Sequence, residues 1–174
     1  MNREKIEYKI RKSIGRERAV NVTLSGSSDT VSLIPLSLFN GILLAASEVS
    51  FRLDGYMVIP LDRIERAQVN KDTGYNEILK KERVLEDINP PKLDMTSISS
   101  VCGYFLRSRE CVSLDVDGGF MVGRVTEIKK KGIKFKPFEA PGKWGKSVKV
   151  RFEDIRDVTF GDMYTRVYAK YTGK

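Results

Sequence analysis

The chain has 174 residues, of which 41% are hydrophobic and 31% are charged, and it carries a formal net charge of +8. It contains no histidine and two cysteines, which excludes the commonest general base, most zinc sites and a disulfide framework. No apolar run reaches the roughly 18 residues of a membrane span, and the charged N-terminus lacks a signal-peptide segment, so we expect a cytoplasmic protein with no membrane contact.

The first half of the chain predicts one helix, several short strands and a second helix. Residues 3–14 place Ile6, Ile10 and Ile14 at four-residue spacing among charges, which is typical of an amphipathic helix. A turn at Asp54-Gly55 is expected to join two strands as a hairpin. The strands are predicted at residues 19–24, 31–34, 42–46, 49–53, 56–60 and 64–69, and the second helix at 74–85.

The second half predicts a helix and then a strand meander. Residues 96–109 have helical apolar spacing, with Thr96 or Ser97 as the N-cap. Residues 164–171 fit either a short helix or an added strand. The strands are predicted at residues 111–116, 120–128, 133–138, 148–152 and 155–160. Asn89-Pro90-Pro91-Lys92 interrupts both patterns, so we divide the chain into a first module (1–88), a linker (89–94) and a second module (95–174).

The apolar pattern of the first module recurs in the second. Residues 61–69 align with residues 152–160, and residues 44–49 align with 123–128. Tyr75 in the first module then matches Tyr164 in the second. The alignment rests on apolar positions more than on identities, and it predicts a duplicated β module in which each tyrosine holds a terminal segment against its sheet.

The second module resembles an Sm-like or SH3-like small barrel. The resemblance is carried by residues 119–125, which fit the bent second strand, and by 148–160, which fit the last strand pair. It implies a mostly β (α+β) protein of two tandem small barrels, and association of copies through edge strands. The loops at 129–132 and 153–154 lack the Asp/Asn and Arg-Gly signatures of that family's RNA pocket, which is therefore not transferred. Residues 158–164 also resemble the ending of bacterial proteins of similar length, a likeness that implies no activity.

Positive charge is concentrated between residues 124 and 151, which hold ten Lys or Arg against two Asp or Glu. Period-2 alternation in 133–136 and 148–152 puts the apolar side chains on one face and the cations on the other. We call the predicted surface the basic face, and it includes Trp144, which is predicted on a loop. Its residues are Arg124, Lys129, Lys130, Lys131, Lys134, Lys136, Lys143, Trp144, Lys146, Lys149 and Arg151.

Three interpretations of the basic face follow from the sequence. Cations with an exposed aromatic ring are what single-stranded nucleic acids require, so RNA binding by a non-enzymatic module is the first. Docking of an acidic protein partner is the second. The third is a lysine-rich surface that only keeps the strands soluble, with Trp144 covering one end of the core. The sequence offers no catalytic residue, metal site or cofactor motif, and Phe135, Phe138, Phe152 and Phe160 are expected in the core.

Overall fold

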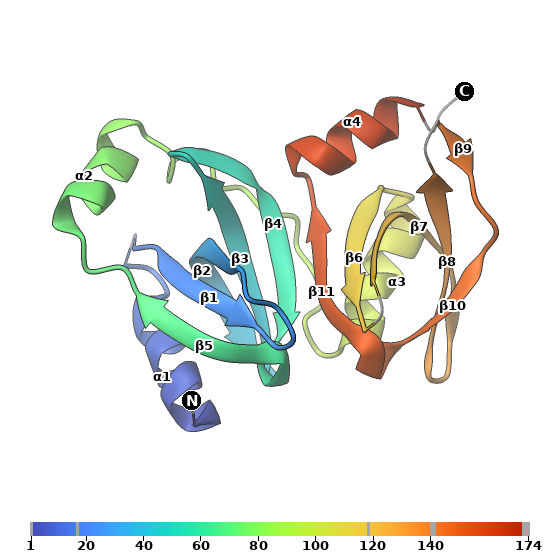
Figure 1. The fold of residues 1–174 in the computed structure, drawn as a ribbon, viewed down its shortest axis with the longest axis horizontal. Helices are drawn as coiled ribbons and strands as arrows, with labels where there is room; N and C mark the ends of the chain where they lie inside the picture. The colour runs from blue at the N-terminus through green and yellow to red at the C-terminus, as the bar shows by residue number, and fades with distance from the viewer. Residues whose placement is uncertain (1, 17, 118, 140–141, 172–174) are drawn as a thin grey trace. The chain divides into compact units, whose positions relative to one another are not determined.

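The protein, described by a computed structural model that covers residues 2–16, 18–117, 119–139 and 142–171, is mostly β with four helices among these residues. The chain divides into two compact units, Met1–Pro91 and Lys92–Lys174. The division falls within the segment predicted as a linker. Figure 1 draws the elements of each unit, which are described separately below.

The first unit is an antiparallel sheet with a helix at each end of its sequence. Its elements are α1 (Arg3–Ser13), β1 (Val20–Leu24), β2 (Thr30–Phe39), β3 (Ile42–Val49), β4 (Arg52–Pro60), the 3₁₀ turn η1 (Leu61–Arg63), β5 (Ile64–Val69) and α2 (Thr73–Lys81). The strand order is β4-β3-β2-β1-β5. The helix predicted at 3–14 is confirmed, and Ile6 and Ile10 are buried against the sheet with Val22, Leu43 and Ile59.

The predicted hairpin at Asp54-Gly55 is wrong. The chain reverses instead at Ser50-Phe51, where both residues have positive φ (52° and 62°), and β4 runs through Asp54 and Gly55. Gly55 has a φ of 76°, and the register between β3 and β4 shifts beside it. The Asp-Gly pair therefore marks a bulge within a strand, a site that also favours a left-handed glycine.

The second unit repeats this order of elements. It contains α3 (Ile98–Ser108), β6 (Val112–Val116), β7 (Gly119–Lys129), β8 (Gly132–Glu139), β9 (Lys143–Trp144), β10 (Val148–Arg151), the 3₁₀ turn η2 (Phe152–Asp154), β11 (Ile155–Phe160) and α4 (Met163–Tyr171). The strand order is β10-β8-β7-β6-β11, and β9 pairs with β8. The segment after β11 is thus a helix, and residues 140–141 of the predicted loop lie outside the described residues.

The core of the second unit lies between α3 and the sheet. Phe105 of α3 packs against Phe160 of β11, with ring centroids 5.0 Å apart. Phe135 and Leu114 are fully buried, and Cys102 and Cys111 are buried free thiols. Phe135, Phe138 and Phe160 are buried as predicted, whereas Phe152 in η2 is only half-buried.

The sheets are open, so the closed barrels expected from the sequence are not found among the described residues. In the first unit β4 and β5 are joined by η1, but β5 pairs with β1 rather than with β4. In the second unit η2 likewise separates β10 from β11, which pairs with β6.

Part of the repeat alignment agrees with the structure and part does not. The match of 61–69 with 152–160 places η1 and β5 beside η2 and β11, at the same position in each unit. The match of 44–49 with 123–128 places β3 beside β7. This part is inconsistent with the topology, because β3 is the third strand of its unit and β7 is the second. Alternating apolar residues look alike in every strand, so an alignment based on them can match a strand of one unit with the wrong strand of the other.

Candidate nucleic-acid interface

The two basic strands are neighbours, as the proposed basic face requires. In the β10–β8 ladder Lys149 lies directly opposite Lys134, and Val150 lies opposite Ile133. Ile133 and Val150 are buried, whereas Lys149 is exposed and Lys134 half-buried. Lys136 lies opposite Arg124 of β7. Strand alternation therefore separates the apolar core from a row of cations on the outer face of the sheet.

Part of this charge is neutralised by a carboxylate on the same face. The Nζ of Lys134 is 2.7 Å from Oε2 of Glu127, and Lys129 contacts the other carboxylate oxygen. These cations, Lys129 first, lower the pKa of Glu127. A register shift in β7 between Val125 and Glu127 places the glutamate opposite Lys134. Glu127 therefore lies on the basic face, whereas the charge count of the sequence records it only as one negative charge without a position.

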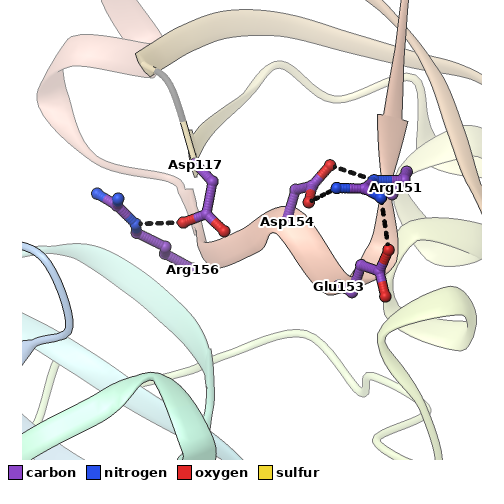
Figure 2. Close-up of polar contacts among 5 residues, drawn as sticks. All are labelled: Asp117, Arg151, Glu153, Asp154 and Arg156. Atoms are coloured by element: carbon purple, nitrogen blue, oxygen red, sulfur yellow. Dashed lines mark hydrogen bonds and ion pairs between the residues drawn. The ribbon is translucent and has the colours of Figure 1, made fainter.

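Arg151 binds carboxylates of its own turn. Its Nε and Nη2 donate to the two oxygens of Asp154 at 2.8 and 2.7 Å, and Nη1 lies 2.8 Å from Glu153 (Figure 2). The bond to Asp154 is the main cause that raises the pKa of Arg151 further above its ordinary value. Arg151 therefore contributes less uncompensated charge to the basic face than the sequence predicts.

Five exposed lysines of the basic face have no ion pair with any other residue that the structure describes. They are Lys130, Lys131, Lys143, Lys146 and Lys149. Lys131 and Lys149 line a hollow of about 160 Å³. Its lining combines two buried apolar side chains with four cations, and it consists of Lys129, Lys131, Gly132, Ile133, Lys149, Val150 and Arg151.

Trp144 lies on a short strand, not on a free loop. It pairs with Phe138 in the β8–β9 ladder and is half-buried. Its ring meets Phe138 edge-on at 5.4 Å, and Arg124 and Lys136 lie 5.2 and 5.5 Å from the ring centre. Because two cations of the protein occupy positions over the indole, Trp144 is poorly placed as the ring on which a base would stack.

The sequence interpretation missed the aromatic rings of α4 and of the start of β7. Phe120 lies 6.0 Å from Tyr164, measured between ring centroids, and Tyr164 lies 4.8 Å from Tyr168. Tyr168 meets Phe138 edge-on at 5.5 Å. The four-residue spacing of the two tyrosines would have indicated a shared helical face, had the segment been assigned to a helix from its sequence.

The carboxylates at the end of β6 are engaged by an arginine. Arg156 donates from Nε to Asp117 at 3.0 Å (Figure 2), and its Nη1 is 3.8 Å from Asp115. Asp162 instead caps α4 and accepts a hydrogen bond from the hydroxyl of Thr165. Among the described residues no cluster of three Cys, Asp or Glu has the arrangement of a metal site.

Among the described residues, no helix has the length and apolar character needed to cross a membrane. Comparison of the chain with protein-family models, with curated proteins and with solved structures finds no match.

Proposed function

We propose that the second unit is a non-enzymatic binding module for RNA or another single-stranded nucleic acid, and that the basic face is its binding surface. The observation that carries the proposal is the direct opposition of Lys149 and Lys134. Like charges directly opposite each other destabilise a sheet, and Glu127 compensates only one of the two. A phosphate that contacts both lysine side chains would offset the repulsion that remains between them.

The arrangement of charge supports phosphate contacts over several nucleotides. Lys130 and Lys131 lie in the β7–β8 turn, Lys149 lies on β10, and Lys143 and Lys146 lie on or beside β9. Each phosphate that a lysine neutralises releases condensed counterions, which drives binding and makes it dependent on salt. No base-specific hydrogen bonding is needed for this mode, and the expected selectivity for sequence is low.

The proposed scaffold is a pair of related small β modules of the Sm-like or SH3-like kind, opened rather than closed. Its support is the shared order of helix, four strands, 3₁₀ turn, fifth strand and helix in the two units, apart from the two-residue β9. The strand orders, β4-β3-β2-β1-β5 and β10-β8-β7-β6-β11, also correspond. Association of copies through edge strands stays a prediction, which sedimentation would test.

An acidic protein is the second candidate partner. Lys134 and Arg151 already bind carboxylates within the unit, and an acidic peptide would present the same groups to the five exposed lysines that have no described carboxylate partner. Steep salt dependence is expected for either ligand. Competition by a polyglutamate peptide, measured against RNA, therefore has to accompany any binding titration.

The test is fluorescence anisotropy of a labelled single-stranded RNA of about 12 nucleotides, titrated at several salt concentrations. The test variant changes four exposed lysines that have no described carboxylate partner to Gln. These are Lys130, Lys131, Lys146 and Lys149. The control changes four exposed lysines of the first unit to Gln, so that the net charge falls equally. These are Lys5, Lys12, Lys71 and Lys81.

We expect the test variant to lose most of its affinity and to reduce the salt slope by up to about 3, since each phosphate contact to a single strand contributes about 0.7. The control is expected to keep the slope. Equal losses in the two variants would mean that only net charge matters, and absence of binding by the unchanged protein at low salt would refute the proposal. Displacement by polyglutamate at lower concentration than by RNA would favour the acidic protein.

A further inference from the structure

Five aromatic rings of the second unit form a continuous row. They belong to β7, α4, β8 and β9, and each ring centroid lies within 6.0 Å of the next. We call this set the aromatic row, and in spatial order it consists of Phe120, Tyr164, Tyr168, Phe138 and Trp144. The row ends at Arg124 and Lys136, which lie over the Trp144 ring.

The two ends of the row differ in exposure. Phe138 is 8% exposed and Trp144 is half-buried, so this end is part of the packing between β8, β9 and α4. Phe120 is 58% exposed and Tyr164 is 47% exposed. Two neighbouring rings that are about half exposed among the described residues form an apolar surface of the kind that can mark a binding site.

The exposed end is held in place by α4. Asp162 and Thr165 are both buried, and the Asp162 carboxylate accepts hydrogen bonds from the Thr165 hydroxyl and from the Thr165 backbone N–H, the latter at 3.4 Å. These bonds fix the start of the helix beside Phe120. Within the helix the Tyr164 hydroxyl donates to that of Tyr168, one turn further on, at 3.2 Å. The Tyr164 ring is therefore presented on a rigid element, and little entropy is lost when a flat ligand covers it.

The row and the basic face lie on one path. Phe120 and Arg124 are four residues apart on β7, which corresponds to roughly 13 Å along a strand. Arg124 is paired with Lys136 across the β7–β8 ladder, and Lys134 and Lys149 continue the line of cations. A single strand of nucleic acid that follows this path would meet the rings first and the cations next.

We infer that Phe120 and Tyr164 are a stacking platform for unpaired bases of a strand whose phosphates lie on the basic face. The inference rests on the proposed function, and it assigns single-strand selectivity to residues outside that face. Charge complementarity favours a nucleic acid over an apolar peptide as the occupant, because the row leads into cations on the same surface. Trp144 is excluded from the role by the two cations over its ring.

The test compares two ligands of equal length and charge, a labelled oligouridylate and an abasic oligonucleotide that has the backbone without bases. The variant carries Phe120→Ala and Tyr164→Ala together. The matched control carries Phe39→Ala and Tyr8→Ala, which remove two rings of the first unit that are 53% and 62% exposed. A conservative variant, Phe120→Tyr with Tyr164→Phe, keeps both rings and exchanges the hydroxyl.

Stacking of one base contributes about 1–3 kcal/mol, so we expect the alanine variant to bind oligouridylate about 5-fold to about 100-fold more weakly. Its affinity for the abasic strand and its salt slope should not change. The conservative variant and the control should bind as the unchanged protein does. Circular dichroism and thermal melting of the alanine variant establish that it is folded, which the exposure of both rings leads us to expect.

The outcomes distinguish failure of the stacking platform from failure of the proposed nucleic-acid binding by the basic face. If the unchanged protein binds neither ligand, the proposed function fails. If it binds both ligands equally, and the alanine variant does the same, the basic face binds phosphates while the platform is refuted. An equal loss on both ligands also refutes stacking, because the rings would then act without bases. Stronger competition by an acidic peptide that depends on the two rings would assign the row to a protein partner.

Discussion

Lys149 lies directly opposite Lys134 in the β10–β8 ladder, while Glu127 binds only Lys134. The positive charge of Lys149 therefore affects stability and binding in opposite directions. A second cation at this position weakens the sheet through repulsion, and the same cation strengthens any contact with a phosphate. Substitution of this residue tests both effects in one protein.

We expect Lys149→Gln to raise the free energy of unfolding by a few tenths of a kcal/mol at low salt while it weakens RNA binding. The stability gain should shrink as salt is added, because screening reduces the repulsion in the unchanged protein. Denaturant titration at low and high salt measures the first effect and anisotropy the second. Lys81→Gln, an exposed lysine of α2, is the control. A gain that persists at high salt would contradict the electrostatic explanation.

The β8–β10 ladder depends on the absence of a side chain at Gly132. A Cβ there would lie 2.0 Å from the carbonyl oxygen of Val150 and 2.9 Å from Cα of Arg151. These are backbone atoms that cannot move without separating the strands. We expect Gly132→Ala to cost about 1–3 kcal/mol of stability and to weaken RNA binding, since β8 and β10 carry Lys134 and Lys149.

Gly103 in α3 is the matched control for this substitution. A Cβ at Gly103 meets only the end of the flexible Arg107 side chain, at 3.4 Å. Alanine is favoured over glycine inside a helix by up to about 1 kcal/mol, so Gly103→Ala should stabilise the protein and leave binding unchanged. Thermal melting of both variants would contradict the argument if the two substitutions shifted the transition in the same direction.

Local periodicity predicted the elements that carry the site. The alternation at 133–136 and 148–152 requires only that each strand has one buried face, and the structure confirms that β8 and β10 are neighbours with their cations outward. The four-residue apolar spacing predicted α1 for the same reason. Each of these patterns depends only on residues that are close together in the sequence, so it can be recognised without knowledge of the tertiary structure.

The features that the sequence did not predict depend on shifts of register or on tertiary packing. Glu127 faces Lys134 only because β7 has a bulge after Val125, and a bulge of one residue exchanges the faces of everything beyond it. The turn at Ser50-Phe51 contains no glycine, asparagine or proline, although both of its residues have positive φ, so the residues that usually mark a left-handed turn are absent. Trp144 was predicted on a loop and lies on β9, because its pairing with Phe138 involves only two residues of β9 and no alternation.

Tyr75 of α2 fastens its helix to a buried carboxylate of β3. Glu48 is 3% exposed, and it accepts hydrogen bonds from the Tyr75 hydroxyl and from the backbone N–H of Phe51, the latter at 2.6 Å. Burial, followed by the bond to Glu48, raises the pKa of Tyr75 to about 12. The hydroxyl therefore stays protonated and donates at every physiological pH.

We expect Tyr75→Phe to lower the free energy of unfolding by about 1–3 kcal/mol, because it leaves one oxygen of a buried carboxylate without its donor. Tyr8→Phe is the control, since Tyr8 is 62% exposed and a surface change of this kind stays within about 0.5 kcal/mol. Denaturant unfolding of both variants checks the difference. Equal stability of the two would mean that water replaces the lost hydroxyl at Glu48.

The stability of the second unit should depend on pH through Asp157. This carboxyl group of β11 is 5% exposed, lies opposite Asp115 in the ladder with β6, and accepts a hydrogen bond from Thr159 at 3.0 Å. Desolvation is the main cause that raises the pKa of Asp157 to about 7, and Asp115 adds to it against the opposing effects of Thr159 and Arg156. The unfolded value is about 3.9.

Between these two values the folded chain binds more protons than the unfolded chain, so its free energy of unfolding falls as the pH rises from about 4 to about 7. Asn at position 157 keeps the shape of the side chain and carries no charge at any pH. We therefore expect Asp157→Asn to be more stable than the unchanged protein at about pH 8, by up to a few kcal/mol, and to gain little at about pH 4. Asp29→Asn, at an exposed carboxylate, is the control. Denaturant unfolding across this range would contradict the argument if Asp157→Asn gave the same difference at every pH.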